Sequence, residues 1–142
     1  MEYKSVEDIF PLMKDEYHRN MAEKIYTFID DNFDDIEIVS LRKCISIAKK
    51  GFIKFATITT ENGNALLLHF PPEIRDNLIT RKEEFGVQFE KPKRELYINQ
   101  INIPFSDIHD VNELYNLLKI AFDNPRRIRN ISHKQIINRG FI

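Results

Sequence analysis

Four residues in the first half of the chain carry side chains suited to binding an anion. Lys43, Lys50, Lys54 and His69 fall in or beside a run of β-forming residues. A charge in a largely apolar strand is costly to bury unpaired, so it reaches solvent, pairs with an acid or binds an anion. The sequence leaves these outcomes open, and it predicts a cationic patch if Lys43, Lys54 and His69 share one face of a sheet.

A second basic group lies in residues 125–142, which contain no acidic residue and five basic ones: Arg126, Arg127, Arg129, Lys134 and Arg139. Cations after a helix stabilise its C-terminus by only about 0.3 to 1 kcal/mol, which does not require so many of them. This C-terminal extension can contact phosphate groups, an acidic protein surface, or the chain's own N-terminal part, because residues 1–40 hold eleven acidic and four basic residues. Phosphate contact is a reasonable hypothesis for four of these residues: Arg126, Arg127, Arg129 and Lys134.

No residue pattern in the sequence indicates catalysis, a metal or a cofactor. His69 has no neighbouring motif that would orient it as an acid or base, and Cys44 is typical of a small buried apolar residue. The remaining histidines lack metal-ligand spacing, and the four glycines are isolated instead of forming a phosphate loop. We therefore expect no catalytic residue, no metal and no cofactor, and an enzyme that uses Lys43 or His69 is the least supported hypothesis.

Lys43, Lys50, Lys54 and His69 lie in or between three short β-runs that are separated by two turn signals. Residues 42–48, 52–60 and 64–70 are rich in Ile, Phe, Thr or Leu, and the turn signals between them are Lys50-Gly51 and Asn62-Gly63. These features predict an antiparallel three-stranded meander. Two-residue loops would pair Ile45 with Ala56, Ile47 with Lys54, Ile58 with Leu67 and Ala56 with His69.

This register assigns the side chains of the meander to two faces. One face would carry Lys43, Ile45, Ile47, Lys54, Ala56, Ile58, Leu67 and His69. The other, more uniformly apolar, would receive the helices and would carry Cys44, Ser46, Ala48, Ile53, Phe55, Thr57, Leu66, Leu68 and Phe70. Exposed apolar residues on the first face would favour a homodimer, since monomers rarely leave such a patch open.

Helix and strand signals surround the meander. Apolar residues at helical spacing predict a helix from about Asp15 to Phe33, a polar helix from about Glu73 to Glu84, and a strongly amphipathic helix that opens on a capping box at Asp110. Residues 95–103 have the composition of a fourth strand, whereas residues 36–39 could be a further strand or a lead-in segment. The fold expected is α+β, an antiparallel sheet of four or five strands with helices packed mainly on one face.

The chain has 142 residues, which suits a single domain with its own core. Its net charge is -1, and its one cysteine cannot form an internal disulfide, which favours a reducing compartment. The N-terminus lacks the features of a signal peptide, and no apolar run approaches the roughly 18 residues of a membrane span. We expect a cytoplasmic protein without membrane contact.

The order of these elements resembles an uncharacterised bacterial family, a domain of unknown function loosely labelled "predicted transport protein" and often found in restriction or nuclease-associated proteins. The resemblance covers residues 20–123 and rests on the segments EKIYTFIDDN, KCISIA, FIKFATI, LLLHFPPE, LYINQI and VNELYNLLKIAF. Lys43 matches the usual lysine of the family's first meander strand. The chain has FEKPKR where the family often has a segment with glycine and histidine. The resemblance implies a fold and an association with nucleic-acid processing, and it implies no reaction.

Two functions therefore follow from the sequence as hypotheses. The first is a non-enzymatic binding module for nucleic acid, or for a nucleic-acid-processing complex, with phosphate contacts from the basic extension and a second patch at Lys43, Lys50 and Lys54. The alternative is a protein-interaction or dimerisation domain whose basic extension docks on an acidic partner surface and which binds no nucleic acid.

Overall fold

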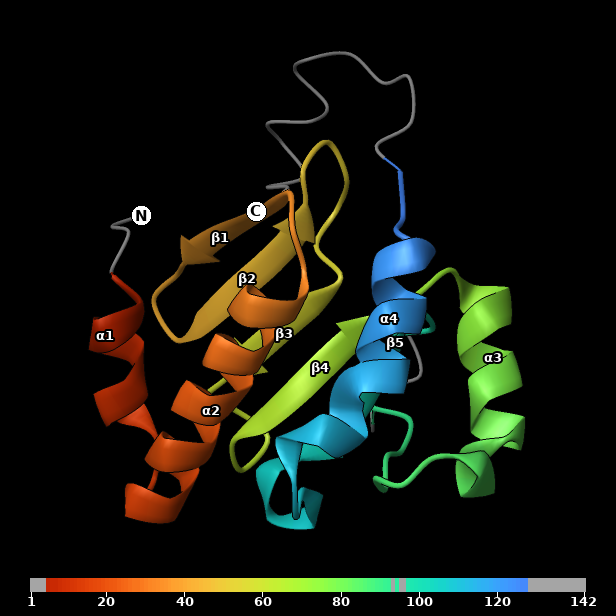
Figure 1. Ribbon diagram of the computed structural model, residues 1–142. Helices are drawn as coiled ribbons and strands as arrows, with labels where there is room; N and C mark the ends of the chain where they lie inside the picture. Colours follow the sequence, from red (N-terminus) through yellow and green to blue (C-terminus); the bar gives the residue numbers. More distant parts are fainter. Residues whose placement is uncertain (1–4, 93, 95–96, 128–142) are drawn as a thin grey trace.

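The computed structural model describes residues 5–92, 94 and 97–127. Its centre is an antiparallel sheet whose five strands are neighbours in chain order (Figure 1), and these are β1 (Ile36–Ser40), β2 (Cys44–Lys49), β3 (Ala56–Thr59), β4 (Ala65–His69) and β5 (Gln100–Pro104). The expected α+β class and antiparallel meander are confirmed. Residues 36–39, which the sequence left undecided, belong to β1, and the predicted fourth strand is β5.

The helical segments begin and end close to their sequence signals. They are α1 (Val6–Ile9), η1 (Phe10–Leu12), α2 (Glu16–Asn32), α3 (Pro72–Thr80), η2 (Lys82–Glu84), η3 (Phe105–Asp107), η4 (Val111–Leu114) and α4 (Tyr115–Asp123). Asp15 caps α2, because its carboxylate accepts a hydrogen bond from the backbone N–H of His18 at 2.8 Å. The capping box predicted at Asp110 is present, although the first turn after it is the 3-10 helix η4 and α4 follows.

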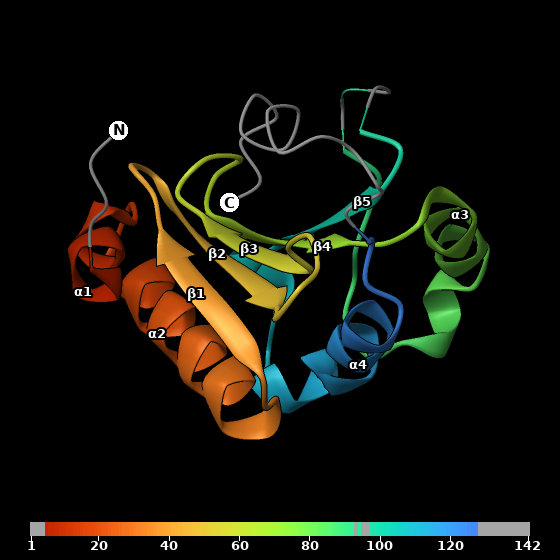
Figure 2. The same cartoon turned by 90° about the horizontal axis from the view of Figure 1, so that it is seen from above.

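The two long amphipathic helices lie on the same side of the sheet. Figure 2 shows α2 and α4 side by side beneath the strands, with α3 beyond the β5 side. Their apolar faces meet fully buried strand residues, among them Ile45, Ile47, Ile58, Leu66, Leu68, Ile101 and Ile103. One face of the sheet is therefore the core of the protein, and the other face is free to carry polar side chains.

The first hairpin has a longer connection than the sequence predicted. Ile45 pairs with Ile58 and Ile47 pairs with Ala56, so β3 is shifted by two residues from the predicted register. The cause is the connection 50–55, in which the turn at Gly51 is followed by a segment that leaves the sheet. A shift of two residues keeps every side chain on its face, but it removes Lys54 from the strand and from its predicted pairing with Ile47.

The register of the second hairpin, between β3 and β4, differs from the predicted register by one residue, and this shift changes which side chains share a face. Ile58 pairs with Leu66 instead of Leu67, because three successive residues, Asn62, Gly63 and Asn64, adopt positive φ angles and widen the turn. A shift of one residue moves each side chain of β4 to the opposite face relative to β3. Leu66 and Leu68 thereby join Ile45 and Ile58 in the core, and His69 turns to the opposite face.

The predicted assignment of faces is therefore wrong for β2 and β3, whereas Leu66 and Leu68 lie on the helix-covered face as predicted. The helices cover the face of Ile45, Ile47, Ala56 and Ile58, which was expected to stay open, while Cys44, Ser46 and Thr57 lie on the side away from the helices. The apolar residues that were expected to favour a second subunit are fully buried in the core. The argument for a homodimer from an open apolar sheet face therefore no longer holds.

Candidate functional site

The basic residues after α4 pair with the connection between β2 and β3. The backbone N–H of Ile53 donates to the carbonyl of Arg126 at 3.0 Å, and Phe52 forms an antiparallel bridge with Arg127. Two segments that are far apart in the sequence are held together by this pairing. It places Arg126 close to Lys54 and Arg127 against Phe52, which the sequence did not predict.

Phe52 lies among these cations. The guanidinium carbon of Arg127 is 5.7 Å from the centre of its ring, and Lys49 Nζ is 5.6 Å from the same ring and 4.6 Å from that of Phe122. Cations near an aromatic face are attracted to its negative charge density. We call this region the basic end of the protein, and its cations are Lys49, Lys50, Lys54, Arg126 and Arg127.

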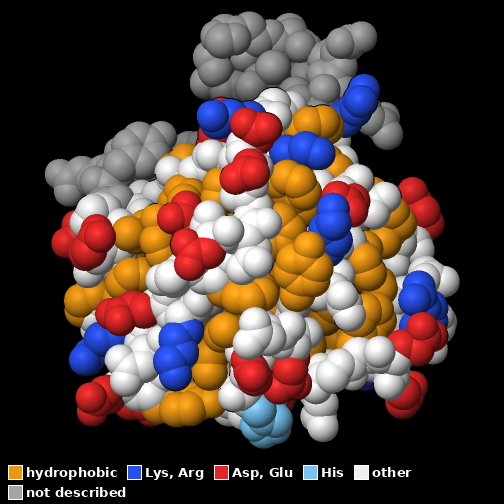
Figure 3. Space-filling model, in the orientation of Figure 1, with side chains coloured by type: hydrophobic (Ala, Val, Ile, Leu, Met, Phe, Trp, Pro, Cys, Tyr) orange, Lys and Arg blue, Asp and Glu red, His pale blue; other side chains and the backbone are white. Residues whose placement is uncertain are grey.

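None of these five cations forms an ion pair with a carboxylate within the part of the chain that the structure describes. Figure 3 shows Lys and Arg side chains at the upper end of the molecule, where α4 ends, with acidic side chains between them. Lys50 and Arg127 are exposed, whereas Lys54 and Arg126 are half-buried. The basic end thus has an outer part in solvent and an inner part against the sheet.

The remaining predicted residues are placed elsewhere. Lys43 is exposed in the turn between β1 and β2, at the other end of β2 from Lys50, and its carbonyl accepts hydrogen bonds from the backbone N–H and the hydroxyl of Thr60. It is therefore not brought to Lys54 and His69. Arg129 and Lys134 lie outside the described residues.

A row of buried polar side chains continues from the inner part of the basic end. Ser46, Thr57, His69 and Asn102 come from four neighbouring strands and point away from the helices, and each is at most 8% exposed. Ser46 lies directly opposite Thr57, and Thr57 Oγ1 is 2.9 Å from His69 Nε2. Polar side chains on a sheet normally face water, so their burial distinguishes this face from an ordinary surface.

Several polar atoms in this region have no hydrogen-bond partner among the described residues. They are Ser46 Oγ, His69 Nδ1, Asn102 Oδ1 and Arg126 Nε, and together they make up four of the five buried unpartnered side-chain atoms in that part of the chain. Buried polar groups in folded proteins are nearly always hydrogen-bonded. Their concentration in one region indicates a place where a partner outside the described residues is needed.

The electrostatic field in this region is positive. Burial, followed by the charges of Lys54 and Arg126, holds the pKa of His69 well below its usual value of 6.5, so the imidazole is neutral at pH 7. Burial also lowers the pKa of the Lys54 ammonium, and the charge of Arg126 adds to this effect. Burial, the larger cause of both shifts, disfavours any unpaired charge, whereas the charges of Lys54 and Arg126 disfavour only further positive charge.

Cys44 is not activated by this field. Burial raises the pKa of its thiol, although the nearby Lys54 charge opposes that shift. A protonated thiol is a poor nucleophile. Cys44 is best described as a half-buried neighbour of Ser46 and Lys54.

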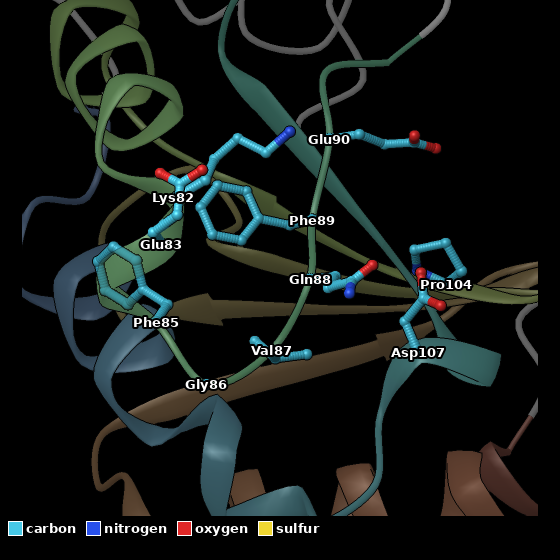
Figure 4. A pocket seen from close by; sticks show the side chains of 10 residues that line it. All are labelled: Lys82, Glu83, Phe85, Gly86, Val87, Gln88, Phe89, Glu90, Pro104 and Asp107. Carbon is cyan, nitrogen blue, oxygen red and sulfur yellow. The ribbon is translucent and has the colours of Figure 1, made fainter.

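The described residues also form a pocket that none of the cations of the basic end lines. Figure 4 shows a pocket of about 540 Å³ between η2, the segment after it and η3, in which the carboxylates of Glu83, Glu90 and Asp107 lie on separate sides. No group of three His, Cys, Asp or Glu side chains in residues 5–92, 94 and 97–127 could hold a metal ion. Within the same residues, no helix has the length and apolar character needed to cross a membrane.

Sequence reasoning missed Lys49, Phe52, Ser46, Thr57 and Asn102. The predicted register separated Ser46 and Thr57 from His69 and put them on the more uniformly apolar face, which was expected to receive the helices. The available signal was the triplet Asn62-Gly63-Asn64, since asparagine tolerates positive φ and a third such residue predicts a wider turn. With the turn widened, His69 falls beside Thr57.

Comparison with protein-family models, with curated proteins and with solved structures gives no match. The fold and the site define this protein as an α+β domain with a five-stranded antiparallel meander, helices on one face, and a cationic, polar region on the other.

Proposed function

We propose that this protein is a non-enzymatic binding module that contacts nucleic acid through phosphate groups at its basic end. The observation that carries the proposal is the backbone pairing of Phe52 and Ile53 with Arg127 and Arg126. Because of this pairing, cations from two distant segments face the same region of space. Fixed cations without carboxylate partners are the usual means by which proteins bind a phosphate backbone.

The aromatic ring at the basic end supports a single-stranded ligand. Proteins that bind single strands combine a cationic groove with aromatic side chains on which bases stack. Phe52 is half-buried and has Lys49 and Arg127 close to its ring. The resemblance to a family associated with nucleic-acid processing agrees with this proposal and stays a prediction.

The hydrogen-bond partner and the pKa of His69 favour a binding role over a catalytic one. General acid-base catalysis by histidine needs a group that orients the ring and matches its pKa to the reaction. The described partner of His69 is the Thr57 hydroxyl, and its pKa lies well below its usual value. A histidine of this kind serves better as a neutral hydrogen-bonding group than as a proton carrier at pH 7.

The test is fluorescence anisotropy with labelled 5′-hydroxyl single-stranded DNA and RNA at salt concentrations from about 50 to about 200 mM. The full chain is compared with Lys50→Gln and Arg127→Gln, which remove exposed cations of the basic end, and with Lys24→Gln, which removes an exposed cation of α2. We expect salt-sensitive binding by the full chain, and a reduction of about 0.7 in the salt slope for each of the first two variants.

The same experiment decides against the proposal in two cases. The first is an absence of salt-sensitive binding of either nucleic acid by the full chain. The second is an equal loss of binding in Lys24→Gln, since this would show that overall charge and not the basic end is responsible. Poly-glutamate serves as a competitor, and competition as strong as that of the oligonucleotide would favour an acidic protein surface as the natural partner.

A further inference from the structure

We propose that the inner part of the basic end, with the polar sheet face beside it, is a site for one terminal phosphate group. The site is formed by Lys54 and Arg126 together with Ser46, Thr57 and His69, which we call the phosphate cluster. The inference goes beyond the proposed function, because a small phosphomonoester can occupy the cluster with no nucleic-acid strand bound.

The first argument is the set of unsatisfied polar atoms. Ser46 and His69 are each 2% exposed, yet Ser46 Oγ and His69 Nδ1 have no hydrogen-bond partner among the described residues, and neither does Arg126 Nε. A buried polar atom without a partner costs about 1 to 3 kcal/mol. A ligand that supplies the missing partners recovers this cost, most clearly at His69 Nδ1 and Arg126 Nε, since Ser46 Oγ also lies beside the Cys44 thiol.

The second argument is that all of these groups can donate. When the Thr57 hydroxyl donates to His69 Nε2, the imidazole proton is left on Nδ1, which makes the unpartnered nitrogen a donor. The Ser46 hydroxyl, the Lys54 ammonium and the Arg126 Nε–H are donors as well. A ligand that satisfies four donors must be rich in acceptor oxygens, and an anionic phosphate group fits this requirement.

The third argument is charge. Two half-buried cations, Lys54 and Arg126, lie close enough to His69 to disfavour its protonation, and neither pairs with a carboxylate within the described chain. A carboxylate ligand would neutralise only one of these charges, whereas a phosphomonoester carries about -1.5 to -2 at pH 7. Because leaving a charge unpaired in a buried site is costly, the cluster favours a phosphomonoester over a carboxylate or a phosphodiester.

The proposal is tested on the full chain with inorganic phosphate, at constant ionic strength, against acetate and chloride. We expect phosphate to raise the melting temperature and to shift the His69 ring nitrogen signals in NMR spectra, with saturation. Arg126→Gln and Lys54→Gln should weaken phosphate binding by about tenfold or more, which is the effect of a lost hydrogen bond to a charged group.

Two further variants separate the cluster from its surroundings. His69→Gln places an amide where Nε2 was, so it can keep the bond to Thr57 while it removes the Nδ1 donor, and we expect a several-fold loss of phosphate affinity. Lys24→Gln removes an exposed cation of α2, outside the basic end, and should leave phosphate affinity unchanged. If phosphate neither stabilises the protein nor shifts the His69 signals, or if Lys24→Gln weakens binding as much as Arg126→Gln, the proposal is overturned.

The source of the phosphate group is decided by a second comparison. A 5′-phosphorylated oligonucleotide that binds at least tenfold more tightly than its 5′-hydroxyl form, with the difference lost in Arg126→Gln, identifies a strand end as the ligand. Binding of inorganic phosphate and a mononucleotide with no such difference identifies a small phosphomonoester. Failure of the nucleic-acid proposal can be distinguished from failure of the phosphate-site proposal. The former is tested with 5′-hydroxyl strands and with variants of the exposed residues Lys50 and Arg127, and the latter with free phosphate and variants of the phosphate cluster.

Discussion

The buried imidazole of His69 should make the stability of the protein depend on pH below neutrality. Its pKa in the folded protein lies well below 6.5, because of burial and then the charges of Lys54 and Arg126, whereas in the unfolded chain it returns to about 6.5. Below that pH the unfolded state binds a proton that the folded state does not bind. The free energy of unfolding therefore falls as the pH falls through 6.5, and it continues to fall until the folded pKa is reached.

The size of this effect follows from a single group. One proton bound only by the unfolded state gives a slope of at most about 1.4 kcal/mol per pH unit, so at most about 2 kcal/mol is lost between about pH 7.5 and about pH 5. The measurement is urea unfolding at intervals over this range in a buffer without phosphate. His69→Gln carries no titrating group at this position, so its unfolding free energy should lack this contribution.

The comparison needs a control because other groups titrate in the same range. His109→Gln removes an exposed histidine that lies outside the phosphate cluster, and this variant should keep the pH dependence of the wild type. The reasoning is refuted if wild type and His69→Gln show the same pH dependence, since the folded protein would then bind the proton as readily as the unfolded chain does.

Two further predictions concern the elements that position the site. Asn64 adopts φ 72°, and its side chain forms two hydrogen bonds of 2.9 Å: it accepts from the backbone N–H of Lys14 and donates to the carbonyl of Thr60. Asn64→Ala should therefore lower the free energy of unfolding by about 2 to 4 kcal/mol. Asn64→Gly also lacks both bonds but adopts the positive φ without strain, so it should lose less stability than Asn64→Ala, and equal losses in the two variants would contradict the strain argument. Asp110→Ala removes the cap of η4 and should cost about 1 kcal/mol in urea unfolding, whereas Asp107→Ala, at a half-buried aspartate that caps none of the described helices, should cost less. Equal losses in the two aspartate variants would contradict the capping argument.

The helices and the order of the strands could be predicted because their signals are local. Asp15 and Asp110 mark helix starts through their own side chains, and apolar residues at helical spacing identify the buried faces of α2 and α4. The positions of both turns were also predictable, since Gly51 and Gly63 adopt positive φ in the turns that they marked.

Register was not predictable to the same degree, because it depends on the number of residues in each loop. The connection 50–55 and the widened turn at Asn62 and Asn64 shift β3 by two residues and β4 by one. Only the second shift changes the faces, and it places His69 beside Thr57 instead of opposite Ala56. The neighbourhood of Lys54 and Arg126 rests on a pairing between distant segments, for which the sequence contains no local signal.

The pairing of Phe52 and Ile53 with Arg127 and Arg126 sets the order in which the molecule can be completed during synthesis. The five strands and α2 precede Arg126 in the chain, so they leave the ribosome first and can begin to fold while the last cations are still being added. Until then, Ile53 lacks its backbone acceptor and Lys54 lacks its neighbouring guanidinium. The pairing between these two segments therefore forms only after translation has passed α4.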